Sequence, residues 1–316
     1  MRVHYCDHFP VPLPEGHRFP MHKYARLRER LVESGVLEPQ QLIAAEPVDL
    51  VEVRAVHTPG YVDAFLGGTL SKDAVRRLGF PWSQQLVRRT LASVGGTCMA
   101  ASAALEDGIS GNLAGGTHHA YRDFGSGFCA FNDIAIAAVG LLNAGRIRRA
   151  LVFDVDVHQG DGTAAIFASD ERVFTCSLHG AKNFPARKTV SDLDVPLADD
   201  TGDEPYLEAM VAALESSLDA ARPDIVFVQA GVDGLATDRL GRLALSSAGM
   251  AERDRVLLER CSAGGLPTVL TLGGGYSEPI EHTIEANMAT YAAARACMRA
   301  SQQPRTRVQP PSRRST

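Results

Sequence analysis

The amino-acid sequence predicts an α/β protein in three layers, with a parallel central sheet covered by helices on both faces. Short runs rich in Val, Ile and Phe alternate with longer segments of helical periodicity, which is the pattern of strands joined by crossover helices. The runs are apolar throughout, as expected of strands that are buried on both faces. A chain of 316 residues can form one such sheet as a single domain.

Five segments are short enough and apolar enough to be strands of this sheet. The expected strands are 3–6, 150–157, 173–178, 225–230 and 268–272. Between them lie segments with apolar residues at helical spacing. The expected helices are 86–105, 132–143, 204–220, 247–263 and 279–298. No internal repeat and no linker interrupts the chain before residue 300, so 1–300 is expected to be one domain.

The last segment, 301–316, is polar and rich in Pro, and we expect a disordered tail there. It contains four Arg and no acidic residue, whereas the whole chain has a net charge of -5. Removing these four charges leaves about -9 on residues 1–300. A body of this sign is expected not to bind nucleic acid and to favour cationic substrates weakly from a distance.

The N-terminal sequence has no apolar signal core, and no segment is apolar enough to span a membrane. The six Cys residues include no Cys-x-x-Cys pair, as is typical of buried thiols in a reducing compartment. We therefore expect a cytoplasmic protein without a membrane partner. Nothing in the sequence specifies an oligomer.

The most informative motif, Asp-Val-Asp-Val-His, comes at the end of the expected strand 150–157. Alternation along a strand would place Asp154, Asp156 and His158 on one face. Burying two carboxylates and an imidazole together is costly unless they are paired or bind a cation. Asp and His are suitable zinc ligands, and two ligands from one segment leave room for a third from elsewhere. The alternative is a polar strand end stabilised only by hydrogen bonds.

A second motif places His118 and His119 directly after Gly115, Gly116 and Thr117. Histidine suits general acid–base catalysis because its pKa lies near neutrality. Carboxylates that do not bind the metal, such as Asp154 and Asp161, could orient the two rings. Taken alone, a His pair is equally consistent with a metal site or with chance.

Two further motifs directly follow expected strands. Asp233 follows strand 225–230, where it could be the third metal ligand or simply a turn residue beside Gly. Tyr276 follows Gly273, Gly274 and Gly275, and its phenol could donate a hydrogen bond to a developing oxyanion. The glycine-rich loop lacks the Gly-Lys-Ser/Thr of a phosphate loop. In open α/β sheets, sites form beyond the carboxyl ends of the strands.

Together and in this order, the motifs resemble the arginase/deacetylase fold and, within it, the zinc-dependent histone deacetylase family. The resemblance extends from about His4 to about Asn287. Further matching segments are His-Thr-Pro-Gly-Tyr-Val at 57–62, Gly-Phe-Cys-Ala-Phe-Asn-Asp at 127–133 and Asp-Arg-Leu-Gly at 238–241. The short chain, with Phe-Pro-Met-His-Lys-Tyr at 19–24 and Asn-Phe-Pro at 183–185, resembles bacterial members near the class IV branch.

The resemblance implies a metal centre of Asp156, His158 and Asp233 that holds zinc, with ferrous iron as the alternative. It also implies a structural potassium ion. The residues implied for potassium are Asp154, Asp156, His158, Ser177 and Leu178.

The same resemblance implies that His119, oriented by Asp161, is the general base and acid, and that Asp154 orients His118. Tyr276 would polarise the scissile carbonyl. The residues implied to line the channel for the acyl-lysine stem are Gly127, Phe128 and Phe184.

These assignments predict a metal-dependent amidohydrolase that hydrolyses the amide of an acylated lysine, or of a similar acylated amine, to a carboxylate and a free amine. The alternatives are an acetylpolyamine-type amidohydrolase of small molecules and a catalytically inactive binding module. A ureohydrolase of the same fold would need Asp where this chain has Gly160. Two departures are Gln159, where many members have a second His, and the lack of Asp in 79–96, where class I members carry a rim Asp that grips the substrate backbone.

Overall fold

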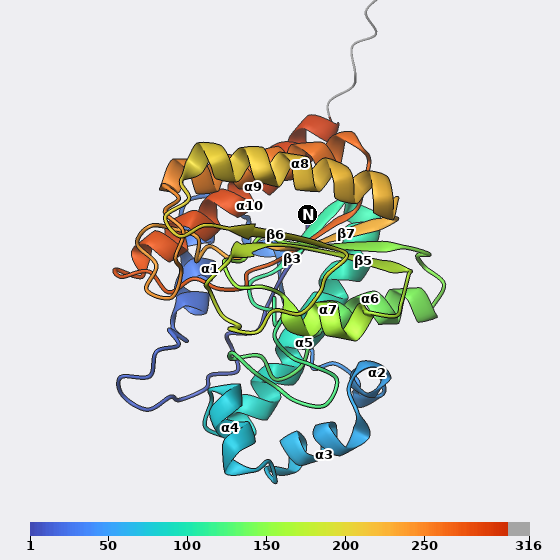
Figure 1. The fold of residues 1–316 in the computed structure, drawn as a ribbon, viewed down its shortest axis with the longest axis vertical. Coiled ribbons are helices and arrows are strands. Elements are labelled where there is room, and N and C mark those ends of the chain that lie inside the picture. Colours follow the sequence, from blue (N-terminus) through green and yellow to red (C-terminus); the bar gives the residue numbers. More distant parts are fainter. Residues whose placement is uncertain (303–316) are drawn as a thin grey trace, which may run out of the picture.

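A computed structural model describes residues 1–302 and shows one sheet of eight parallel strands between two layers of helices (Figure 1). The strand order is β2-β1-β3-β8-β7-β4-β5-β6. The predicted three-layer α/β architecture is therefore confirmed. The tail expected to be disordered lies outside the described residues from 303 onward, and the boundary at residue 300 stays a prediction.

The strands are short, and all five expected strands are present. Their bounds are β1 Val3–Tyr5, β2 Leu42–Ala44, β3 Ile109–Asn112, β4 Ala150–Asp154, β5 Val173–Gly180, β6 Leu193–Leu197, β7 Ile225–Gln229 and β8 Thr268–Thr271. Sequence reasoning missed β2, β3 and β6. The strand β3 reads Ile-Ser-Gly-Asn, and β6 contains Asp and Pro, so neither forms an apolar run.

The helices divide between the two faces of the sheet (Figure 1). On one face lie α1 Lys23–Glu33, α8 Asp203–Ala221, α9 Ser247–Ala263 and α10 Glu281–Gln302. On the other lie α2 Leu50–Val56, α3 Pro59–Gly67, α4 Lys72–Leu78, α5 Gln84–Asp107, α6 Asp133–Asn143 and α7 Asp161–Phe167. The five expected helices are present. Sequence reasoning missed α2, α3, α4 and α7, which have seven to nine residues each, and α1, which has 11.

Strand alternation sends side chains into two separate cores. In β4, Leu151 and Phe153 pack in the core beneath α8–α10, while Ala150 and Val152 pack against α5 and α6. Each fully buried aliphatic or aromatic side chain contributes about 1.5–3 kcal/mol relative to exposure. This two-sided burial explains why β4 and β7 carry no polar residue until their last position.

Four neighbouring strands, β3, β8, β7 and β4, end at the same edge of the sheet. The segments that follow them carry the tandem His, the Gly-rich loop with Tyr276, Asp233 and the Asp-x-Asp-x-His motif, respectively. Because the strands are parallel, their order in the sheet brings all four motifs together. Sequence reasoning placed only three motifs at strand ends, because β3 was not recognised.

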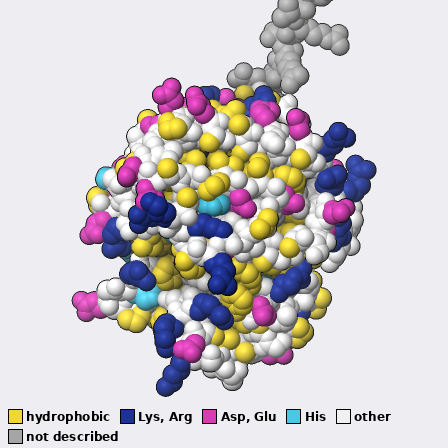
Figure 2. All heavy atoms as spheres, in the orientation of Figure 1, with side chains coloured by type: hydrophobic (Ala, Val, Ile, Leu, Met, Phe, Trp, Pro, Cys, Tyr) yellow, Lys and Arg dark blue, Asp and Glu magenta, His cyan; other side chains and the backbone are white. Residues whose placement is uncertain are grey.

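No described helix is both long and apolar enough to cross a membrane. The six cysteines, all within the described residues, form no disulfide. On the face shown in Figure 2, Lys and Arg side chains gather across the central and lower part, whereas most Asp and Glu side chains lie nearer the outline.

Candidate active site

The Asp-x-Asp-x-His motif is presented by a turn and not by a strand, which corrects the sequence-based argument from alternation. The strand β4 ends at Asp154, and the chain then bends. Asp154 Oδ1 accepts a hydrogen bond from the Asp156 backbone N–H at 3.1 Å, and Asp156 Oδ1 accepts one from His158 N–H at 2.9 Å. Such side-chain bonds to the backbone two residues on compete with strand pairing and favour turns.

Asp156, His158 and Asp233 form a compact buried cluster with the donor set of a divalent metal site. His158 Nδ1 lies 3.0 Å from Asp156 Oδ1 and 3.0 Å from Asp233 Oδ2. One potential ligand atom from each residue lies within 4.8 Å of the others. The two carboxylates are 1% and 0% exposed, so they require a compensating positive charge.

A proton on His158 can supply that charge. Burial would lower the pKa of His158, but the carboxylates of Asp156 and Asp233 outweigh it and raise the pKa to about 10. A divalent cation could replace this proton and engage all three side chains. The residues therefore fit a catalytic metal with three protein ligands.

Neighbouring groups hold the two carboxylates in place. Asp156 Oδ2 accepts hydrogen bonds from the Gly274 backbone N–H at 2.7 Å and from Gln229 Nε2 at 2.9 Å. Asp233 Oδ1 accepts one from Val157 N–H at 2.9 Å. A side chain at position 274 would collide with the Asp233 carboxylate, which explains why this close approach requires Gly. Sequence reasoning did not find Gln229.

The tandem His residues face two different carboxylates. His118 Nδ1 lies 2.6 Å from Asp154 Oδ2, and His119 Nδ1 lies 2.6 Å from Asp161 Oδ1. Asp161 sits at the first turn of α7, and its other oxygen accepts a hydrogen bond from Tyr121 at 3.1 Å. These are the pairings that the resemblance implied.

The loop that carries the two His residues is fixed by Asp133, at the first position of α6. Its carboxylate accepts hydrogen bonds from the backbone N–H groups of Gly116 at 3.1 Å and Thr117 at 2.7 Å. Asp133 belongs to a segment that matched the family pattern, but its support of this loop was not predicted.

The two rings differ in protonation. Burial would lower the pKa of His118, but Asp154 and Asp156 outweigh it and raise the pKa to about 9. Burial, reinforced by the positive charge of His118, lowers the pKa of His119 to about 4. At neutral pH, His119 is therefore the ring that can accept a proton.

Two hydrogen bonds to backbone groups hold the loop that carries Tyr276. The Tyr276 N–H donates to Asp238 Oδ2 at 2.6 Å, and the buried Lys23 ammonium donates to the Gly275 carbonyl at 3.2 Å. Burial raises the pKa of the phenol well above its usual value, so Tyr276 stays protonated and can donate a hydrogen bond. Burial lowers the pKa of Lys23 to about 8.

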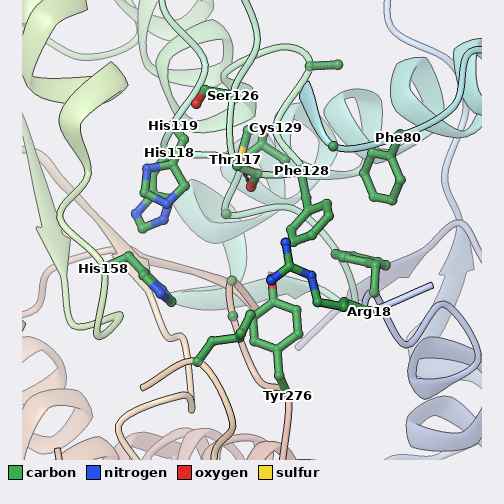
Figure 3. Close-up of a pocket in the computed structure, with 18 of the residues that line it drawn as sticks. Arg18, Phe80, Thr117, His118, His119, Ser126, Phe128, Cys129, His158 and Tyr276 are labelled. Carbon is green, nitrogen blue, oxygen red and sulfur yellow. Dashed lines mark hydrogen bonds between the residues drawn. The ribbon is translucent and has the colours of Figure 1, made fainter. Parts of the chain in front are cut away.

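The metal cluster, the tandem His residues and Tyr276 line one cavity of about 1120 Å³. Figure 3 shows His118, His119, His158 and Tyr276 in it. Phe128 and Phe184 form part of its wall. The ring centroids of Phe128 and Tyr276 are 6.2 Å apart, and those of Phe184 and His119 are 4.9 Å apart. A Cβ at Gly127 would lie 2.6 Å from the His119 ring, and Gly127 has a φ of 52°. Gly at this position lets the wall approach His119 closely.

Other residues that line the cavity were not named as site residues from the sequence. They include Arg18, Phe19, Phe80 and Arg89. Arg89, on α5, is buried and lies 4.7 Å from the Tyr24 ring centroid. Gln159, by contrast, points away from the cluster, because its amide donates to Thr189 O and Asp194 Oδ1 at 2.6 and 2.7 Å.

The model of the histone deacetylase domain matches residues 17–293 of this chain. The chain belongs to the histone deacetylase family. The predicted family is thus confirmed, while its placement near the class IV branch stays a prediction. Membership makes the chain a deacetylase-type hydrolase of a family that is generally metal-dependent.

Curated relatives agree with this placement in the histone deacetylase family, and a solved structure shares the fold. An uncharacterized protein of Picosynechococcus is 45% identical over 93% of this chain and 98% of its own length. A probable deacetylase of Archaeoglobus fulgidus is 31% identical over 81% of this chain and 75% of its own length. The crystal structure of an acetylpolyamine aminohydrolase from Burkholderia pseudomallei superimposes with a TM-score of 0.77 at 21% identity, over 93% of this chain and 98% of that one, which shows the shared arginase/deacetylase fold.

Proposed function

We propose that this histone deacetylase family member is a zinc-dependent deacylase that hydrolyses the amide of an acylated lysine or a similar acylated amine. The observation that carries the proposal is one cavity containing a buried Asp-His-Asp cluster, a neutral His119 and a protonated Tyr276. Amide hydrolysis needs these three capacities, namely a cation site, a proton acceptor and an oxyanion donor.

Asp156, His158 and Asp233 would hold the metal, which when bound supplies Lewis acidity toward the amide carbonyl and toward water. Zinc is favoured by the Asp and His ligands, and ferrous iron is the alternative. Asp154 and Asp161 position the two imidazoles. The potassium site is proposed at Asp154, Asp156, His158, Ser177 and Leu178, and Asp154 and Ser177 are partners in the sheet register.

His119 would move the protons. Its Nδ1 faces the Asp161 carboxylate, which favours a hydrogen on Nδ1 and leaves the lone pair on Nε2. That nitrogen can take the proton of the attacking water and later give a proton to the leaving amine. His118, whose charge is balanced by Asp154, would keep the pKa of His119 low.

The walls of the cavity suit an alkyl stem that ends in an amide. Phe128 and Phe184 offer apolar contact in the wall of the cavity, and burying a methylene contributes about 0.8 kcal/mol. A small acylated amine is the second candidate. It is favoured by the absence of any carboxylate from the cavity-lining residues of 79–96, all of which the structure describes.

The test is a panel of lysine amides that carry acetyl to long-chain acyl groups, together with acetylated polyamines. Release of amine and carboxylate in equal amounts from at least one compound is the expected result. A folded, metal-loaded enzyme that turns over none of them would contradict the proposal and favour a binding module.

Tyr276→Phe is expected to keep the metal and the fold but to lose roughly a hundredfold or more in kcat, the usual scale for one oxyanion donor. The substitution removes only the hydroxyl, and the loop contacts to Asp238 and Lys23 involve backbone atoms. Steady-state kinetics with matched metal content measures the effect. Near-normal turnover would refute the role of the phenol.

A minimal acyl-lysine amide should be cleaved nearly as well as a longer neutral peptide, measured as kcat/KM. The cavity-lining residues of 79–96 offer no carboxylate to a peptide backbone, and each net hydrogen bond contributes only about 1 kcal/mol. A neutral peptide preferred by more than roughly a hundredfold, about 2.7 kcal/mol, would reveal a backbone anchor elsewhere on the rim.

A further inference from the structure

Six basic side chains line the outer part of the cavity, and all six are exposed. We call this set the basic mouth. It comprises Arg18, Arg76, Arg77, Lys182, Arg239 and Arg242. These residues come from the loop before α1, from α4, from the segment after β5 and from the segment after Asp233, so only the fold gathers them.

Carboxylates neutralise the basic mouth only in part. Four of its members have an ion-pair partner: Arg76 with Asp73 at 3.0 Å, Lys182 and Arg242 with Asp199 at 3.4 and 2.6 Å, and Arg239 with Glu278 at 3.5 Å. Six cations thus face three acids, and exposed pairs of this kind are weak. Within the part of the chain that the structure describes, the carboxylates lining the cavity are Asp156 and Asp233, both in the buried metal cluster.

Arg18 and Arg77 are the members without a carboxylate partner. Arg18 forms no ion pair or hydrogen bond within residues 1–302, and Figure 3 shows its guanidinium near the rings of Phe128 and Tyr276 in this view. Arg77 lies 4.1 Å from the Phe124 ring centroid and has no ion pair among the described residues. Both guanidinium groups therefore have free donors where a substrate would enter.

From this charge arrangement we infer that the enzyme selects acylated amines whose neighbouring groups are negatively charged. The inference rests on the proposed deacylase function and specifies its substrate class. A cationic mouth attracts anionic substrates and repels cationic ones, both during encounter and in the bound complex. It therefore disfavours acetylated polyamines and lysines within basic segments.

The inference reverses what the net charge alone suggests. A chain of net charge -5 would attract cations from a distance. At the mouth, however, the nearest charges dominate because screening at physiological salt limits interactions to about 8 Å. The local excess of positive charge therefore decides which substrate approaches the cavity.

The test compares three peptides of equal length, each with a central acyl-lysine carrying the acyl group that the enzyme cleaves best. The acyl-lysine is flanked by Asp and Glu, by Gly and Ser, or by Lys and Arg. At low salt, kcat/KM should rank acidic, then neutral, then basic, with at least about tenfold between the first and the last. High salt should narrow that ratio.

A second comparison asks whether the recognised negative charge belongs to an acidic peptide or to a small anionic molecule. Acyl-lysine with a free carboxylate is set against its amide. If the carboxylate form gains as much as the acidic peptide, one charge next to the acylated amine is sufficient. If only the peptide gains, the enzyme recognises a longer acidic segment.

The Arg18→Gln/Arg77→Gln double variant should reduce the acidic-to-basic ratio by at least about threefold, and Arg18→Gln alone should reduce it by less. Arg148→Gln is the matched control for the loss of charge, because its side chain is 90% exposed and does not line the cavity. That control should leave the ratio unchanged.

Equal kcat/KM for the three peptides, or an unchanged ratio in the double variant, would overturn the inference while leaving the deacylase function intact. Failure to hydrolyse any acylated amine would instead overturn the proposed function. The two failures are therefore distinguishable in one set of assays.

Discussion

Asp156→Ala, His158→Ala and Asp233→Ala are each expected to lose bound metal and catalytic activity together. Each substitution removes one of the three donors of a group whose ligand atoms all lie within 4.8 Å of one another. Mutation of groups that merely support metal ligands costs about 10–100-fold in metal affinity or activity. Loss of a ligand should therefore exceed about a hundredfold.

The prediction is checked by metal analysis of purified protein and by kcat/KM on the best acyl-lysine amide. Asp192→Ala is a suitable control, because Asp192 accepts hydrogen bonds from Thr175 at 2.8 Å and does not line the cavity. It should retain metal and activity. Full metal occupancy in all three cluster variants would show that the metal binds elsewhere.

His119→Ala should lower kcat by roughly 10²–10⁴-fold, the range for a positioned general acid–base group. The same change at His118 should cost less. The physical reason is the difference in protonation, since the pKa of His119 is lowered to about 4 whereas that of His118 is raised to about 9. A ring that already holds a proton at neutral pH cannot accept another.

Metal content distinguishes this interpretation from a ligand role. Neither ring is in the Asp-His-Asp cluster, so both variants should retain metal. Circular dichroism would verify that the fold survives the loss of a buried side chain. If metal leaves with either imidazole, the tandem His residues are ligands and the assigned proton transfer is wrong.

The sequence predicted those parts of the fold that have a strong local signal. The strands β4, β7 and β8 are buried on both faces and rich in aliphatic or aromatic residues, so each was recognised and the motif after it was placed at a strand end. The strand β3 carries Ser, Gly and Asn in four residues and gave no such signal. Its position beside β8 comes from hydrogen bonding between segments that are far apart in the sequence, which the local residue pattern does not show.

The same limit applies to the site. The motif residues could be identified from their spacing, but Gln229 and Lys23 had no spacing to reveal them. Gln229 looks like one more residue of a buried strand, yet its amide holds Asp156. Lys23 looks like a surface residue of a helix start, yet it is 2% exposed and contacts the Gly-rich loop. Their roles depend on contacts between distant segments.

The charge distribution around the cavity, like these contacts, could not be predicted from the sequence. Its members are spread from residue 18 to residue 242, among acidic residues that dominate the net charge. Only the folded arrangement puts the cations at the cavity. The net charge therefore predicted cationic substrates, whereas the basic mouth favours anionic ones.

Removal and return of the metal tests the central claim most directly. The protein is stripped with a chelator, and zinc or ferrous iron is then titrated back while hydrolysis of the best acyl-lysine amide is followed. The account predicts negligible activity in the stripped protein and full recovery at one equivalent per chain, with no recovery in Asp233→Ala. Full activity in the stripped protein, or recovery in Asp233→Ala at one equivalent, would contradict it.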